Sequence, residues 1–198
     1  TSNGSGLYID ELELGVLDML DEGFELGLPN YFSIIDMGNN PGTFKIDKYL
    51  PATDSTHLAV DCYEGDSTNS GIADDYLITP RLLVQKDFIF SFKSASDNAD
   101  FLDGFRLLAS TTGTDVVDFT IVIDEVAETP TDYTLYEYAL ADISELAEED
   151  SVYFAIHANT NGSWIYFDDI VYKQGFPDVV LAEDFENGLP ETWTVIDE

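Results

Sequence analysis

The stretch Asp87-Phe88-Ile89-Phe90-Ser91-Phe92-Lys93 decides the fold class. Its apolar aromatic residues recur at every second position, so Phe88, Phe90 and Phe92 lie on one face of an extended chain and Ile89 and Ser91 on the other. Such alternation is typical of a β-strand with one buried face. We therefore expect the phenylalanine face to lie in the core.

Further short runs rich in Val, Ile, Phe and Tyr, bounded by Gly, Pro, Asn and Asp, surround this stretch and predict more strands. The expected strands are Phe32–Asp36, Thr43–Asp47, Leu58–Tyr63, Tyr76–Thr79, Phe88–Ala95, Phe105–Ser110, Phe119–Val126, Thr134–Ala139, Val152–Ala158 and Ile165–Tyr172. About ten strands at this spacing indicate an all-β sandwich or barrel. Ala141–Glu148, an acidic stretch with Ile143 and Leu146 three residues apart, predicts one short helix at most.

The chain of 198 residues suits one main domain, and its charge is extreme, because 7 basic and 40 acidic residues give a net charge of −33. Such a surface repels phosphate backbones and anionic lipids, which argues against a nucleic-acid partner and against membrane insertion. Carboxylate repulsion also destabilises a compact state unless cations neutralise part of it. The composition therefore favours calcium as cofactor, high salt, or both, and an extracellular or cell-surface location.

The residue types give little support for catalysis, so we expect no enzyme. Cys62 is the only cysteine, which excludes a disulfide within the chain, and we expect a buried, inert thiol. His57 and His157 are the only histidines, and the odd spacing from His57 to Cys62 would put the two side chains on opposite faces of one strand. Glycoside hydrolysis needs two suitably placed carboxyl groups, but among 40 acidic residues such a pair is expected by chance and does not indicate an enzyme.

The two ends of the chain repeat each other. Thr1–Leu14 aligns without gaps to Asn159–Tyr172, and Glu22–Asp36 aligns to Glu183–Asp197, in the same order. One interpretation is a window on a tandem array with a repeat of about 160 residues; the alternative is two related hairpins within one fold.

The array interpretation divides the chain into five segments. Residues 1–14 would be the last strand of a preceding repeat, 22–173 a complete domain and 183–198 the first strand of a following repeat. Residues 15–21 and 174–182 would be the linkers between them. The partners would then be neighbouring repeats or copies of the chain itself, through head-to-tail assembly or strand exchange that could build a filament.

The motifs FELGLPNYF near Phe24, ADDYLITPRL at Ala73–Leu82, FIFSFKSAS at Phe88–Ser96 and IYFDDIVY at Ile165–Tyr172 resemble the cleaved-adhesin or choice-of-anchor J domain family. LLASTTGTDVVDFT, at Leu107–Thr120, belongs to the same pattern. The resemblance implies a jelly-roll β-sandwich of a bacterial surface protein, related in shape to MAM domains and carbohydrate-binding modules. It implies an adhesion or structural repeat that binds a glycan or a host surface protein, with a carbohydrate-binding module of a larger secreted protein as the alternative.

The resemblance also implies a structural calcium ion where the first and last strands meet. Its expected ligands are Glu25 and Asp168, with Asp36, Asp61 and Asp169 as additions; the alternative is an acidic rim without an ordered ion. Asp74 and Asp75 would hold a second cation or cap a turn. Trp164 and Tyr166 would stack on a sugar or pack in the core.

Overall fold

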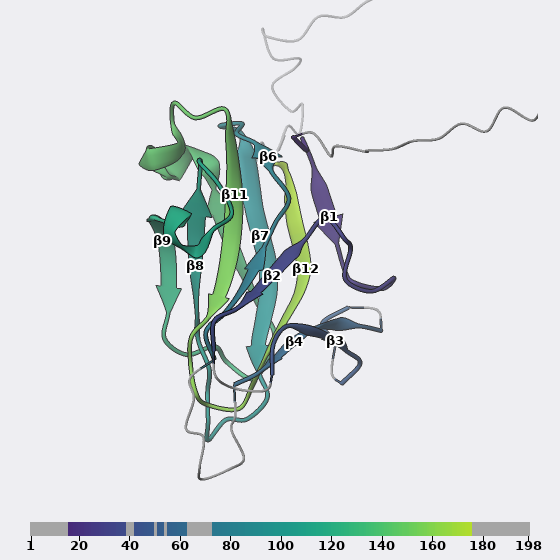
Figure 1. Ribbon diagram of the computed structural model, residues 1–198. Coiled ribbons are helices and arrows are strands. Elements are labelled where there is room, and N and C mark those ends of the chain that lie inside the picture. The colour runs from purple at the N-terminus through teal and green to yellow at the C-terminus, as the bar shows by residue number, and fades with distance from the viewer. Residues whose placement is uncertain (1–15, 39–41, 50, 54, 63–72, 176–198) are drawn as a thin grey trace, which may run out of the picture.

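The computed structural model describes residues 16–38, 42–49, 51–53, 55–62 and 73–175. In this part of the chain twelve strands form two sheets that face each other (Figure 1). The strands are β1 (Leu20–Glu22), β2 (Ser33–Asp36), β3 (Lys45–Asp47), β4 (His57–Asp61), β5 (Asp75–Ile78), β6 (Leu82–Leu83), β7 (Phe88–Ser96), β8 (Phe105–Ser110), β9 (Ile121–Val126), β10 (Thr134–Ala139), β11 (Ser151–Ala158) and β12 (Trp164–Gln174).

The first sheet has the order β10-β7-β12-β4-β3, and β1 pairs with the end of β12. The second sheet has the order β2-β5-β11-β8-β9, and β6 pairs with the start of β11. All of these strand pairs are antiparallel. The all-β prediction and its jelly-roll form are confirmed.

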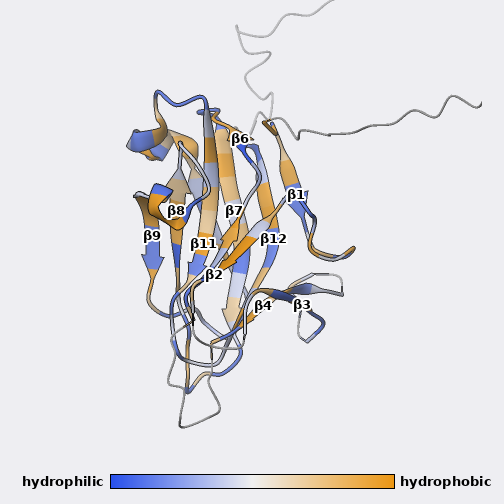
Figure 2. Ribbon diagram, viewed as in Figure 1, coloured by the Kyte–Doolittle hydropathy of each residue, from blue (hydrophilic) through white to orange (hydrophobic). Residues whose placement is uncertain are grey.

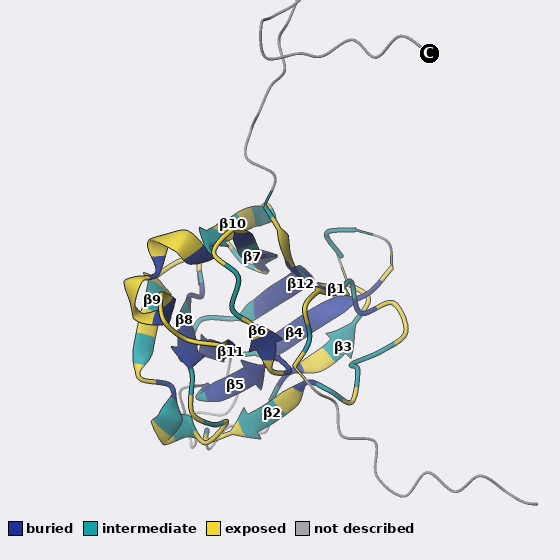
Figure 3. Ribbon diagram, turned by 90° about the horizontal axis from the view of Figure 1, so that it is seen from above, coloured by how far each residue is buried: buried dark blue, intermediate teal, exposed yellow. Residues whose placement is uncertain are grey.

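The core lies between the sheets, and Figure 3 shows buried segments facing inward from both layers. Phe88, Phe90 and Phe92 are buried, as their alternation predicts. Phe90 of the first sheet stacks on Phe154 of the second with ring centroids 4.3 Å apart. In Figure 2 the central strands β7, β11 and β12 carry hydrophobic colour, whereas β3 is largely hydrophilic.

Each of the ten predicted strands overlaps a strand of the structure, with ends that differ by up to two residues. The short strands β1 and β6 were not predicted, because two or three residues show no periodicity. Ala141–Glu148 contains no single helix: residues Leu140–Asp142 and Ser144–Leu146 form two separate 3-10 turns, η2 and η3. Ile143 interrupts them with extended backbone angles, while its side chain and those of Leu140 and Leu146 are buried. Residues Val116–Asp118 form a third turn, η1.

The predicted segment boundaries fall partly inside the described residues. Leu20 and Asp21, which the sequence analysis assigned to the linker 15–21, belong to β1 and pair with the end of β12. Leu17 forms a bridge with Leu82. The expected terminal repeat segments 1–14 and 183–198, and most of the linker 174–182, lie outside the described residues.

The aromatic core gives a direct test of this packing. Phe92 contacts Phe105 at 5.2 Å, Tyr136 at 5.8 Å and Phe167 at 6.0 Å between ring centroids. Replacing Phe92 with Ala leaves a cavity among these rings, so we expect the free energy of unfolding in urea to fall by about 3–5 kcal/mol. Leu135→Ala, on exposed β10, is the control and should cost less than about 0.5 kcal/mol. Equal losses would contradict this account of the core.

Candidate functional site

The outer face of the first sheet carries the polar and aromatic residues of β12. Side chains alternate along a strand, so Trp164, Tyr166 and Asp168 point away from the core, whereas Ile165 and Phe167 point into it. Tyr166 lies between Ala59 of β4 and Ala95 of β7. These two alanines leave room above the sheet for the loops that cover it.

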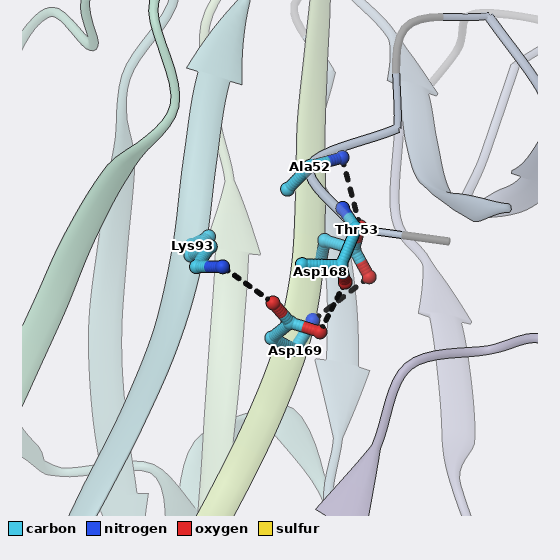
Figure 4. A network of polar contacts seen from close by, with 5 residues as sticks. All are labelled: Ala52, Thr53, Lys93, Asp168 and Asp169. Carbon is cyan, nitrogen blue, oxygen red and sulfur yellow. Dashed lines mark hydrogen bonds and ion pairs between the residues drawn. The ribbon is translucent and has the colours of Figure 1, made fainter. Parts of the chain in front are cut away.

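Asp168 is fully buried on this face and holds a loop in place. Its Oδ2 accepts hydrogen bonds from the backbone N–H groups of Ala52 at 3.0 Å and Thr53 at 3.3 Å, and its Oδ1 accepts one from the backbone N–H of Asp169 at 2.8 Å (Figure 4). Burial raises the pKa of Asp168 to about 6, although the N–H donors of Asp169 and Thr53 act against this rise. The carboxylate is therefore anchored by backbone dipoles rather than by a cationic side chain.

Asp169 holds the same loop from the neighbouring position. Its Oδ1 accepts a hydrogen bond from the Thr53 hydroxyl at 2.7 Å, and its Oδ2 pairs with Lys93 Nζ at 2.8 Å, as Figure 4 shows. The register between β12 and β7 shifts here, and Asp169 has a φ of 50°. This β-bulge lets two consecutive aspartates serve the same loop, because it interrupts the alternation of side chains.

Glu25 holds the next part of the loop. Its carboxylate accepts hydrogen bonds from the Ser55 backbone N–H at 3.0 Å, the Ser55 hydroxyl at 2.6 Å and the Thr56 backbone N–H at 3.1 Å. These bonds, first among them that of the Ser55 side chain, lower the pKa of Glu25. The Thr56 hydroxyl also donates to the Phe24 carbonyl at 2.8 Å.

We call Glu25, Asp168 and Asp169 the carboxylate clamp, and residues 51–53 and 55–56 the covering segment. The structure brings three of the five expected calcium ligands to this segment, which fits the expectation that the first and last strands meet. Asp36 lies on the second sheet, opposite Asp75, and Asp61 lies opposite Trp164. Among the residues that the structure describes, no three His, Cys, Asp or Glu are grouped to hold a metal. The carboxylate and hydroxyl oxygens are nevertheless the donor types that calcium takes.

A hollow of about 320 Å³ opens beside the covering segment, on the same outer face. Residues of β7, of β12 and of two loops line it: Pro51, Ala95, Ser96, Asp97, Thr131, Asp132, Tyr133 and Tyr166. The Tyr166 hydroxyl donates to Asp97 Oδ1 at 3.0 Å, and the Tyr166 ring packs edge-on against His57 with centroids 4.7 Å apart. The hollow thus combines two tyrosine side chains, of which Tyr166 is held in place, with the exposed carboxylates of Asp97 and Asp132.

The two aromatic residues expected to stack on a sugar have different surroundings. Tyr166 lines the hollow, with 4% of its surface exposed. Trp164 lies on the same face but outside the hollow's lining, and Lys45 Nζ sits 4.0 Å from the centre of its ring. Tyr133 and Asp132 were not predicted as site residues, because nothing in a single sequence shows that the residues before β10 lie across from the end of β7.

Asp74 and Asp75, expected to hold a second cation or cap a turn, point in different directions. Asp74 Oδ1 lies 2.8 Å from His157 Nε2, and the His157 ring stacks on Tyr76 with centroids 3.9 Å apart. Asp75 is fully buried, and neither of its carboxylate oxygens has a hydrogen-bond partner among the described residues.

A further buried aspartate, Asp103, anchors another loop. Asp103 accepts hydrogen bonds from the Thr160 hydroxyl at 2.5 Å and from the backbone N–H groups of Gly162 at 2.8 Å and Ser163 at 2.5 Å. A Cβ on Gly162 would lie 2.7 Å from Asp103 Oδ1, which explains the glycine at this position of the Asn-Gly-Ser sequence. Cys62 is buried and unpaired, as expected.

No helix within the described residues is long and apolar enough to cross a membrane.

Comparison with known proteins places these features in context. The family model of the cleaved adhesin domain matches residues 17–171. Hemagglutinin A of Porphyromonas gingivalis is 26% identical over 203 residues, which cover 90% of this chain and 8% of that protein. The chain therefore spans only a small part of that curated relative.

Solved structures share the fold. The K1 cleaved adhesin domain of Lys-gingipain from Porphyromonas gingivalis superposes with a TM-score of 0.62 at 19% identity, over 80% of this chain and 99% of that one. The carbohydrate-binding module TmCBM61, in complex with β-1,4-galactotriose, gives a TM-score of 0.53 at 15% identity, over 77% and 94% of the two chains. A CBM22-2 xylan-binding domain from Paenibacillus barcinonensis gives 0.51 at 10% identity, over 78% and 98%.

The clamp predicts that the covering segment loosens when one of its hydrogen bonds is removed. Thr53→Val keeps the side-chain shape but removes the hydroxyl that donates to Asp169, so we expect a loss of about 1 kcal/mol or less in global stability. Amide hydrogen exchange should quicken at residues 52, 53, 55 and 56 more than elsewhere. Thr120→Val, at an exposed turn, is the matched control. Unchanged exchange in the covering segment would show that the clamp does not hold it.

Proposed function

Because the chain belongs to the cleaved adhesin domain family, we propose that it is a non-catalytic, extracellular adhesion module that binds neutral glycans in the hollow beside the covering segment. The observation that carries this proposal is the pairing of Tyr133 and Tyr166 with Asp97 and Asp132 around one hollow. A sugar ring presents an apolar C–H face and a rim of hydroxyl groups, so it suits a site that offers both aromatic rings and carboxylate acceptors.

The size and rigidity of the hollow support a small ligand. Its 320 Å³ volume lies at the lower end of the range of about 300–1,000 Å³ that small-molecule sites occupy. Tyr166 is held by the hydrogen bond to Asp97 and by the His57 ring, so its position is set before a ligand arrives. A preorganised aromatic side chain costs little conformational entropy on binding.

The negative charge of the hollow and of the whole chain favours neutral glycans over anionic ones. Asp97 and Asp132 are exposed at the hollow, and the whole chain carries a net charge of −33. Sialylated, uronic-acid and sulfated glycans would meet repulsion from both the site and the surface. Neutral hydroxyl-rich sugars can instead donate hydrogen bonds to the carboxylates.

The second hollow is a weaker candidate. It measures about 470 Å³ and is lined by residues between Asp21 and Tyr31, from the end of β1 and the loop that follows it. Tyr31 is the only aromatic residue in its lining, and the Tyr31 hydroxyl donates to Glu22 at 2.9 Å.

The carbohydrate-binding modules that share the fold further support glycan binding as the role of this domain, since one is in complex with β-1,4-galactotriose and another is a xylan-binding domain.

Calcium at the carboxylate clamp is the second part of the proposal. Glu25, Asp168 and Asp169 reach the same covering segment from the loop after β1 and from β12, and these residues would hold the ion. A bound calcium ion would offset the repulsion between Asp168 and Asp169 and fix the segment that forms one wall of the hollow.

Removing an aromatic wall of the hollow tests the glycan proposal. Tyr133→Ala should weaken binding to a neutral oligosaccharide such as β-1,4-galactotriose or a xylo-oligosaccharide about tenfold or more. Binding is measured by calorimetry after a glycan-array survey. Tyr153→Ala, on the outer face of the second sheet, should leave the affinity unchanged. If no neutral glycan binds the wild type, or if both variants bind as the wild type does, the proposal is wrong.

Thermal unfolding in EDTA, in millimolar calcium and in sodium chloride of matched ionic strength tests the clamp as a calcium site. A ligand that binds only the folded state at about 100 times its Kd adds about 2.7 kcal/mol, so calcium should raise Tm beyond the sodium control. Glu25→Gln should reduce that rise, whereas Glu137→Gln, on exposed β10, should not. A sodium effect as large as that of calcium, or an unchanged rise in Glu25→Gln, would reject the site.

A further inference from the structure

Asp75, the first residue of β5, is a buried carboxylate without a partner. None of its surface is exposed, and neither Oδ1 nor Oδ2 has a hydrogen-bond partner among the described residues. Its neighbour Tyr76 belongs to the apolar cluster on the outer face, while Leu77 belongs to the main core. Because side chains alternate, Asp75 shares the inner face with Leu77 and lies at the end of the space between the sheets.

The other two buried aspartates among the described residues show what Asp75 lacks. Asp103 and Asp168 each accept three hydrogen bonds from backbone or hydroxyl donors. An ionised carboxylate in the interior costs several kcal/mol unless it is paired or hydrogen-bonded. Asp75 therefore needs a compensating group that the described side chains do not supply.

A second carboxylate lies directly across the strand pair. Asp36 is the register partner of Asp75 between β2 and β5, and like charges at directly opposed positions repel each other. None of the ion pairs formed by the described residues includes either aspartate. Burial is the main reason that the pKa of Asp75 rises to about 6, and the Asp36 and Asp74 charges add to the rise.

The hydroxyl of Thr43 is a third oxygen-bearing group near Asp75 and Asp36. Thr43 Oγ1 is buried and, like the carboxylate of Asp75, has no hydrogen-bond partner of good geometry among the described residues. It lies close enough to Asp75 to lower that residue's pKa. The carboxylates of Asp75 and Asp36 and the hydroxyl of Thr43 thus lie near one another, and no ion pair of the described residues includes either aspartate. All three groups would bind a cation through oxygen atoms.

We propose that Asp75, Asp36 and Thr43 form a second cation site that binds calcium at this end of the sandwich. Calcium takes six to eight oxygen ligands, including carboxylates, hydroxyls, backbone carbonyls and water, in flexible geometry. The nearby thiol of Cys62 does not direct the site toward zinc, since burial raises the pKa of Cys62 and keeps it protonated.

This site is separate from the carboxylate clamp. Asp168 lies on the outer face of the first sheet, whereas Asp75 lies on the inner face of the second sheet. The proposal also does not depend on glycan binding, because neither Asp36 nor Asp75 lines the hollow beside the covering segment.

The test compares Asp75→Asn with the wild type in EDTA and in calcium, by thermal unfolding and by calorimetric titration of the EDTA-stripped protein with calcium chloride. In EDTA the variant should have the higher Tm, because it lacks the unpaired buried charge. In calcium the order should reverse, because only the wild type gains the ion. The titration should show one calcium fewer per chain in the variant.

Three further variants separate this site from the alternatives. Asp36→Asn changes an exposed side chain, so it should fold, and it should weaken calcium binding at this site about tenfold or more. Asp150→Asn, just before the opposite end of β11, is the matched control and should titrate like the wild type. Glu25→Gln removes calcium from the clamp alone, so loss of that site is distinguished from loss of this one.

The proposal is overturned if Asp75→Asn shifts Tm equally in EDTA and in calcium, because Asp75 is then a buried acid without an ion. If Asp75→Asn does not fold, the result for Asp36→Asn decides: an unchanged calcium stoichiometry and affinity overturn the proposal, and a lost or weakened site supports it.

Discussion

The hydrogen bonds that three carboxylates accept from one loop are the constraint on which the functional face depends. Glu25, Asp168 and Asp169 hold residues 52, 53, 55 and 56 through backbone N–H groups and hydroxyls. The loop is therefore fixed over the outer face of the first sheet. Pro51, at its start, then forms part of the hollow that Tyr166 also lines. Without the clamp, the hollow would lose a wall and Asp168 would lose the donors that compensate its burial.

Part of this arrangement could be predicted from the sequence, and part could not. The alternation of Phe88, Phe90 and Phe92 predicted a buried strand face correctly, because burial on one face imposes a period of two. The first and last strands of the domain do meet, since β1 pairs with β12, and Glu25 and Asp168 each accept hydrogen bonds from the covering segment. The β-bulge that lets Asp169 join them is a backbone irregularity without a sequence signal. Tyr133 lines the hollow only because of the register between β10 and β7, and a single sequence does not encode that register visibly.

The acidity of the chain has more than one structural role. Most of the acidic residues that the structure describes are exposed, where their charge repels anions. Asp103 and Asp168 are buried and serve as acceptors that fix loops, so their charge is compensated within the fold. Asp75 is buried and receives no such hydrogen bonds from the residues that the structure describes. The difference between compensated and uncompensated burial, rather than the number of carboxylates, indicates where a cation would contribute to stability.

We propose that the hollow beside the covering segment is where this adhesin domain binds its ligand. The most direct measurement is a titration of the 15N-labelled protein with β-1,4-galactotriose and with xylo-oligosaccharides, followed by amide chemical shifts. We expect the largest changes in amide chemical shift at residues 95–97 and 131–133 and at Tyr166. Shifts confined to residues 21–31 or to the outer face of the second sheet, or no shifts with any neutral glycan, would contradict the proposal.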